Sequence, residues 1–150
     1  MTLIHNKKAL RDYEVIDKFE AGIELFGFEV KSLRSGQGSL AGSYVTVNPF
    51  GAILQKANIP PFQAQNVSED YDPERPRRLL FHKKELVSLS QKLGTPGLTL
   101  IPISLYNRRG LIKVDVALAR GRKKHDKREQ IKKRDEERNI EREIKQNVRF

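Results

Sequence analysis

Apolar and polar residues alternate along much of the first 119 positions of this 150-residue chain. The longest such run covers residues 13–25, where most odd-numbered positions are apolar and most even-numbered ones are charged, with Ile16 and Asp17 as exceptions. A period of two predicts a long, half-buried strand whose apolar residues all lie on one side. Gly22 inside this run predicts a bend or bulge, which small closed barrels use to turn their corners.

Four further strands are expected, in two pairs that each flank a short turn sequence. They are residues 43–47 and 52–59 around the turn 48–51, and residues 98–106 and 111–119 around the turn 107–110. Pro102 lies inside the third of these strands. Because proline cannot donate a ladder hydrogen bond, it predicts an edge strand or a bulge at this position.

The period changes in two segments, which we expect to form short helices. Apolar positions lie three apart in residues 28–34, and Gly36 follows as a helix cap. Three leucines form one stripe in residues 83–93, and Gly94 ends that helix.

Two other segments have no clear period. Residues 6–11 are a short basic lead-in. Residues 60–78, with four prolines and few apolar residues, predict a long surface loop.

These elements predict a mainly β fold. Five or six strands with two helices, no strand–helix–strand rhythm and no internal repeat favour an OB-like antiparallel β-barrel with flanking short helices. We expect this domain to cover residues 1–119. Residues 120–150 form a separate basic C-terminal tail.

Charge separates the tail from the rest of the chain. Residues 120–150 hold 13 Lys and Arg against 7 Asp and Glu, a net +6 out of +10 for the whole chain. Good helix formers dominate the tail, but its apolar stripe of Ile140, Ile144 and Val148 is too thin to offset the entropy of ordering. We therefore expect a tail that is disordered when free and helical when bound to RNA. A solubility tail or half of a coiled coil are the alternatives.

Few features of the sequence indicate catalysis. There is no cysteine, no metal-ligand spacing of histidines and no glycine-rich phosphate loop, so we expect no metal, no cofactor and no enzyme activity. Asp17, Glu24 and Glu29 are carboxylates that could pair for catalysis, although surface or ion-paired acids are favoured. No apolar run is long enough to span a membrane and no signal peptide is visible, which favours the cytoplasm.

A nucleic-acid partner is favoured by the basic balance. Cationic residues recur on surfaces expected to face solvent, where they can neutralise phosphates. They are Lys7, Lys8, Lys31, Arg34, Arg75, Arg77, Arg78, Lys83, Lys84 and Lys113.

The run Phe19-Glu-Ala-Gly-Ile-Glu-Leu-Phe-Gly-Phe-Glu-Val-Lys-Ser-Leu-Arg-Ser-Gly36 resembles the bacterial SmpB family, small protein B, which binds transfer-messenger RNA (tmRNA). Other matching motifs follow in order over nearly the whole chain: Asn6 to Ala9, Ser43 to Val45, Asp72-Pro73, Arg75 to Leu80, Leu105-Tyr106, Ala117 to Gly121 and His125 to Arg128. The resemblance implies an OB-like barrel that binds the tRNA-like domain of tmRNA and brings it to stalled 70S ribosomes. There the RNA serves trans-translation, in which an incomplete protein receives a degradation tag.

The resemblance also implies site residues. The tmRNA face would include Asn6, Lys7, Lys8, Glu20, Lys31, Ser32, Arg34, Arg78 and Leu80. Glu20 could accept from base amino groups or hold a neighbouring Lys or Arg in place. The tail would contact the ribosome: Gly121, Lys123, Lys124 and His125 in the decoding centre, and Asp126, Lys127 and Arg128 leading into a helix in the empty mRNA channel.

Two other functions stay open on the residues alone. One is a general RNA-binding barrel, such as a ribosomal protein or RNA chaperone, with a nonspecific basic tail. The other is an RNA-processing enzyme, which the lack of a catalytic constellation disfavours.

Overall fold

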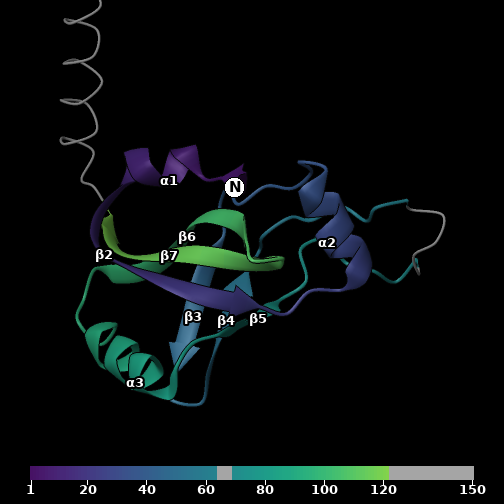
Figure 1. Cartoon of the computed structure of the whole chain (residues 1–150). Coiled ribbons are helices and arrows are strands. Elements are labelled where there is room, and N and C mark those ends of the chain that lie inside the picture. Colours follow the sequence, from purple (N-terminus) through teal and green to yellow (C-terminus); the bar gives the residue numbers. More distant parts are fainter. Residues whose placement is uncertain (64–68, 122–150) are drawn as a thin grey trace, which may run out of the picture.

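The computed structural model describes residues 1–63 and 69–121, and the chain is shown in Figure 1. Seven strands and three helices occur in this part of the chain. In order they are β1 (Thr2–His5), α1 (Lys7–Asp12), β2 (Tyr13–Ile23), α2 (Gly27–Arg34), β3 (Tyr44–Asn48), β4 (Gly51–Gln55), β5 (Arg77–Leu80), α3 (Lys83–Lys92), β6 (Leu98–Arg108) and β7 (Leu111–Gly121). The fold is mainly β with a few short helices, as the alternation predicts.

All strand pairings are antiparallel, and they form a closed circuit. The sheet order is β1-β6-β3-β4-β5-β2-β7, and β7 pairs again with β6. Strand β1 therefore lies outside a ring of six strands. The ring is closed by short ladders, since β3 meets β6 only at Val45 and Leu100, and β2 meets β5 at two positions.

The main core lies inside this ring. It includes Leu54, Leu100, Val114 and Val116, all fully buried, together with Leu33 of α2 and further apolar residues from every strand of the ring. A second, smaller cluster lies on the outer side of β6 and β7, where α1 packs over it: Ala9, Ile101, Ile103, Ala117 and Ala119. Figure 1 shows α1 and α3 on opposite sides of the strands, with α2 beyond one end.

The expectation that the apolar residues of 13–25 share one side is wrong. The register of β2 against β7 shifts between Val15 and Asp17, so the strand carries a bulge there. One extra residue reverses the side-chain alternation. Tyr13 and Val15 therefore pack against the outer cluster, while Phe19 and the apolar residues after it pack into the main core. Ile16 and Asp17 broke the pattern because the bulge lies there.

Three elements differ from the sequence expectations. The basic lead-in is helix α1, residues 2–5 form a strand, and the loop after residue 60 ends in strand β5. Each element has only four to six residues, too few to establish a period. Pro102 does lie at a bulge, since the β6–β7 register shifts between Pro102 and Ser104. It is not on an edge, because β6 pairs with three strands.

Within the described residues, no helix has the length and apolar character needed to cross a membrane.

Candidate nucleic-acid interface

The outer side of the β6-β7-β2-β5 region is covered at one end by α1 and uncovered at the other. The register aligns Tyr106 with Lys113, Lys113 with Gly22, and Gly22 with Leu80, and Glu20 lies two positions before Gly22 on β2. Directly paired residues point to the same side of a sheet. We call the surface formed by Glu20, Gly22, Leu80, Tyr106 and Lys113 the open face. Half of the Leu80 side chain is exposed on it.

Glu20 is the anionic centre of the open face. Its carboxylate accepts hydrogen bonds from the Tyr106 hydroxyl and, at 2.8 and 2.9 Å, from Nη1 of Arg108. The bond from Tyr106, followed by that from Arg108, lowers the pKa of Glu20. Burial and then the bond to Glu20 raise the pKa of Tyr106. Of the two roles considered for Glu20, the structure shows the second, since the carboxylate holds a neighbouring cation.

Tyr106 and Arg108 were not among the expected site residues, although both contact Glu20. Tyr106 belongs to an expected strand and a family motif, and Arg108 lies in the expected turn 107–110, so neither position indicates a contact with Glu20. Their place follows from the register of a strand more than 80 residues from Glu20.

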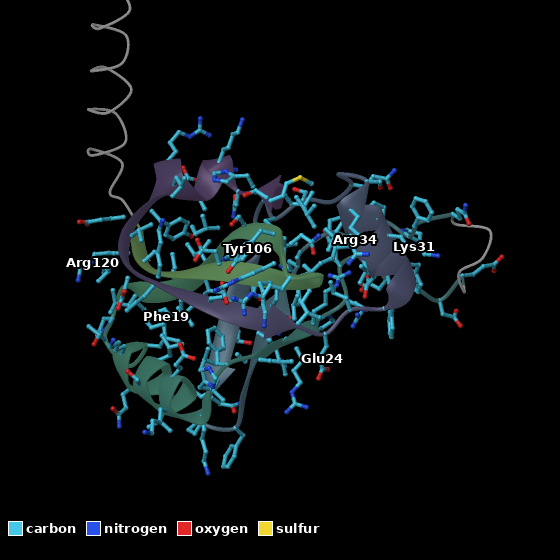
Figure 2. The ribbon with its side chains drawn as sticks, in the orientation of Figure 1. Phe19, Glu24, Lys31, Arg34, Tyr106 and Arg120 are labelled. Carbon is cyan, nitrogen blue, oxygen red and sulfur yellow. The ribbon has the colours of Figure 1, made fainter. Side chains whose placement is uncertain are left out.

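Helix α2 borders the open face. Lys31 and Arg34 are exposed on it, and Nη2 of Arg34 donates to the Gly110 carbonyl oxygen at 3.2 Å, in the β6–β7 turn. Figure 2 shows both side chains on α2, with Tyr106 over the strands beside them. Ser32 does not belong to this surface, because it is fully buried and its hydroxyl donates to the side chain of Gln37 at 3.3 Å.

The end of α2 is fixed by Gly36, as its sequence position predicts. Gly36 has a φ of 83°, its amide donates to the carbonyl of Leu33, and the next amide, of Gln37, donates to the carbonyl of Ser32. This pair of bonds is a Schellman motif, which satisfies carbonyls left free by the end of the helix.

A buried ion-pair cluster holds α2 against the rest of the fold. The Glu29 carboxylate is fully buried and accepts from Tyr71 at 2.8 Å, from Nε of Arg75 at 3.1 Å and from Nε of Arg77 at 2.8 Å. Burial acts to raise the pKa of Glu29, but the bonds from Arg75, the Phe26 amide, Arg77 and Tyr71 together lower it. Glu29 is thus ion-paired, as favoured from the sequence.

The expectation that all ten cationic residues of the sequence analysis face solvent is wrong for Arg77. It is fully buried and donates to the carbonyls of Ala57 at 2.7 Å and Pro73 at 2.9 Å as well as to Glu29. A buried arginine is stable only when its charge is paired and its donors are satisfied. Arg78, the next residue on β5, is exposed on the same side as Leu80.

Asn6 is also interior. It is 5% exposed, its oxygen accepts from the Ala9 amide at 3.3 Å at the start of α1, and its nitrogen donates to the carbonyl of Pro102 at 2.9 Å. Lys7 and Lys8 are exposed on α1, which lies over the covered end of the same strands.

The structure thus brings Glu20, Leu80 and Arg34 to one surface, whereas Asn6 and Ser32 are buried, Asn6 at the start of α1 and Ser32 within α2. Gly121 ends β7. The other tail residues of the candidate site, Lys123, Lys124, His125, Asp126, Lys127 and Arg128, lie outside the described residues, as does the expected tail helix. Within residues 1–63 and 69–121, no group of three or more potential metal ligands occurs.

Comparison with known proteins gives a consistent result. The SmpB protein family model matches residues 3–146. An SsrA-binding protein of Thermosipho africanus is 48% identical over 95% of each chain, and one of Chlorobaculum tepidum is 46% identical over 94% of this chain and 90% of its own. A solved structure described as tmRNA–SmpB on a journey to the center of the bacterial ribosome contains a chain that is 40% identical with a TM-score of 0.68, covering 83% of this chain and 87% of that one. The chain belongs to the SmpB family.

Proposed function

We propose that this protein binds the tRNA-like domain of tmRNA and delivers it to stalled ribosomes for trans-translation. The observation that carries the proposal is its likeness over most of its length to SsrA-binding proteins and to a chain in a ribosomal tmRNA–SmpB structure. The protein acts by binding and not by catalysis. A ribosomal role gives it a cytoplasmic location.

The open face and its borders are the tmRNA-binding surface. Arg34, Lys31 and Arg78 supply cations for phosphates, and Leu80 supplies an exposed apolar contact for an unstacked base. Lys7 and Lys8 extend the cationic edge. Glu20 orients Arg108, Asn6 holds the carbonyl of Pro102, and Ser32 acts through its hydrogen bond to the Gln37 side chain.

Residues 1–119 form the tmRNA-binding domain, an OB-like barrel. The closed circuit of six antiparallel strands supports this description. Residues 120–150 form the ribosome-binding tail, with Gly121, Lys123, Lys124 and His125 at the decoding centre and the following residues in the empty mRNA channel. The net +6 of this segment supports a polyanionic partner.

The test is a comparison of binding to tmRNA and to a control RNA of equal length at about 0.2 M salt, where nonspecific electrostatic binding is weak. We expect tmRNA to bind roughly 10³-fold more tightly, as is usual for specific complexes. Equal binding would identify a general RNA-binding protein instead. Cleavage of labelled RNA by the purified protein would indicate a processing enzyme.

A further inference from the structure

A hollow of about 440 Å³ lies between the start of α2 and strand β5, next to the open face. It is lined by Glu24, Leu25, Phe26, Arg75, Pro76 and Arg78. Its volume falls within the range of sites that bind small ligands, roughly 300–1,000 Å³. Figure 2 shows Glu24 where the chain leaves β2 toward α2, on the side of the strands that meets the helix.

Phe26 is an aromatic platform in this hollow. Half of its surface is open to solvent, at 51% exposure, although the residue begins a helix that packs on the core. The Arg75 guanidinium carbon lies 4.1 Å from the centre of the ring, and the Phe28 ring lies 5.5 Å away. Aromatic rings exposed in this way bind unstacked bases, and an adjacent arginine adds a cation–π contribution.

The platform is held rigidly. The Arg75 guanidinium donates to both carboxylate oxygens of Glu29, at 2.5 and 3.1 Å, and Glu29 is itself fixed in the core by Arg77 and Tyr71. Because two hydrogen bonds to a buried carboxylate hold the Arg75 guanidinium in place, the surface against Phe26 is preorganised. Preorganisation reduces the entropy that a ligand must overcome on binding.

Two charged side chains flank the ring. The Glu24 amide donates to the Arg78 carbonyl at 3.0 Å, so these residues are neighbours across the end of the β2–β5 ladder. Neither takes part in an ion pair within the described part of the chain. Arg78 is therefore available to a phosphate, and Glu24 can accept a hydrogen bond from the exocyclic amino group of a base.

The hollow is continuous with the open face. Arg78 lies two residues before Leu80 on β5. Glu24 follows the last residue of β2 and lies two residues after Gly22. Both residues therefore continue the outward-facing rows of these strands. An RNA that lies across the open face would reach the hollow without changing direction.

We propose that this hollow binds one unstacked nucleotide of the RNA on the open face, with the base on Phe26, its amino group toward Glu24 and its phosphate at Arg78. The inference rests on the proposed function, because it needs an RNA on that face.

The first experiment measures the affinity of the full chain and its variants for the tRNA-like fragment of tmRNA at one salt concentration. Phe26→Ala should weaken binding roughly 5- to 150-fold, the equivalent of stacking one base, and Phe26→Tyr should retain it. Val87→Ala is the control, because Val87 is 43% exposed on α3 and does not line this hollow, so its loss should leave affinity unchanged. Thermal unfolding of each variant checks its fold.

The second experiment uses the wild-type protein and is independent of how the variants fold. Ultraviolet cross-linking to the same RNA, followed by peptide mass spectrometry, should place a cross-link on Phe26. Any one of three results would overturn the subsite. They are cross-links confined to other residues, wild-type affinity for Phe26→Ala, and an equal loss of affinity for Val87→Ala.

Different results would contradict the proposed function and the proposed subsite. If the wild-type chain does not prefer the tRNA-like RNA to a control RNA, the proposed function is wrong. If the wild-type chain prefers it but the cross-link or the loss of affinity at Phe26 is not found, only the subsite is wrong.

Discussion

At the scale of single residues, burial decides what a charge does. Arg77 and Arg78 are adjacent in the sequence, yet one is fully buried against Glu29 and the other is exposed. The pleat of β5 turns neighbours to opposite sides, but the sequence gives no sign that this strand exists, because it follows a proline-rich loop. The partner of Arg77 lies 48 residues away, so only the tertiary structure assigns its role.

Glu29→Gln should destabilise the protein by about 3–5 kcal/mol, because it leaves the buried Arg77 without its charge partner. The measurement is urea unfolding at pH 7. Glu14→Gln, at an exposed position of β2, is the control and should change the free energy of unfolding by less than about 0.5 kcal/mol. Equal effects of the two substitutions would show that the charge of Glu29 stabilises the protein no more than an exposed carboxylate does.

The same carboxylate predicts a pH dependence. The pKa of Glu29 is lowered in the folded protein from its ordinary 4.5, so the folded state binds the proton less readily than the unfolded state. Its stabilising contribution is present above about pH 4.5 and is lost as pH falls through the folded value. Between pH 7 and pH 3, the free energy of unfolding should fall less steeply for Glu29→Gln than for the wild-type protein. Parallel curves would contradict this assignment.

At the scale of elements, periodicity located the long strands and the two longer helices but not the side of the strand on which a residue lies. The run 13–25 is a strand, as its alternation predicts. Its bulge between Val15 and Asp17 depends on pairing with β7, about 100 positions later. The bulge lets one strand serve two clusters, the outer one under α1 and the main core. Because the open face starts beyond the bulge, the position of Glu20 also depends on it.

Gly36→Ala tests how firmly the end of α2 is fixed. A side chain there meets no atom within 4 Å, so any cost comes from the φ of 83°, and we expect about 1–2 kcal/mol. Gly27→Ala is the matched control: it also meets nothing within 4 Å but has no positive φ, so it should be neutral or slightly stabilising. Chemical unfolding measures both. Comparable losses would mean that the Schellman geometry does not matter.

At the scale of the whole molecule, the open face and the start of the tail lie at opposite ends of one strand. Lys113 lies on the open face near the start of β7, and Gly121 ends the strand eight residues later, a span of roughly 26 Å at about 3.3 Å per residue. Figure 2 shows Arg120 at the side of the strands away from Lys31 and Arg34. The part of an RNA that lies on the open face is therefore separated from the start of the tail by the length of this strand.

This separation predicts what deletion of residues 127–150 will do. The described strands pair with one another within residues 1–121, and the deletion leaves all of these residues in place, so affinity for the tRNA-like RNA should stay nearly unchanged. Tagging of incomplete proteins on stalled ribosomes should be abolished, because the proposed contacts in the mRNA channel are gone.

Arg34→Glu should show the reverse order of effects. It weakens RNA binding first, because the new carboxylate repels phosphates, and it reduces tagging only as a consequence. RNA affinity and tagging measured on the same preparations distinguish the two. If the deletion removed both activities together, the surface and the tail would have to act as one binding unit, and the distance along β7 would have no functional meaning.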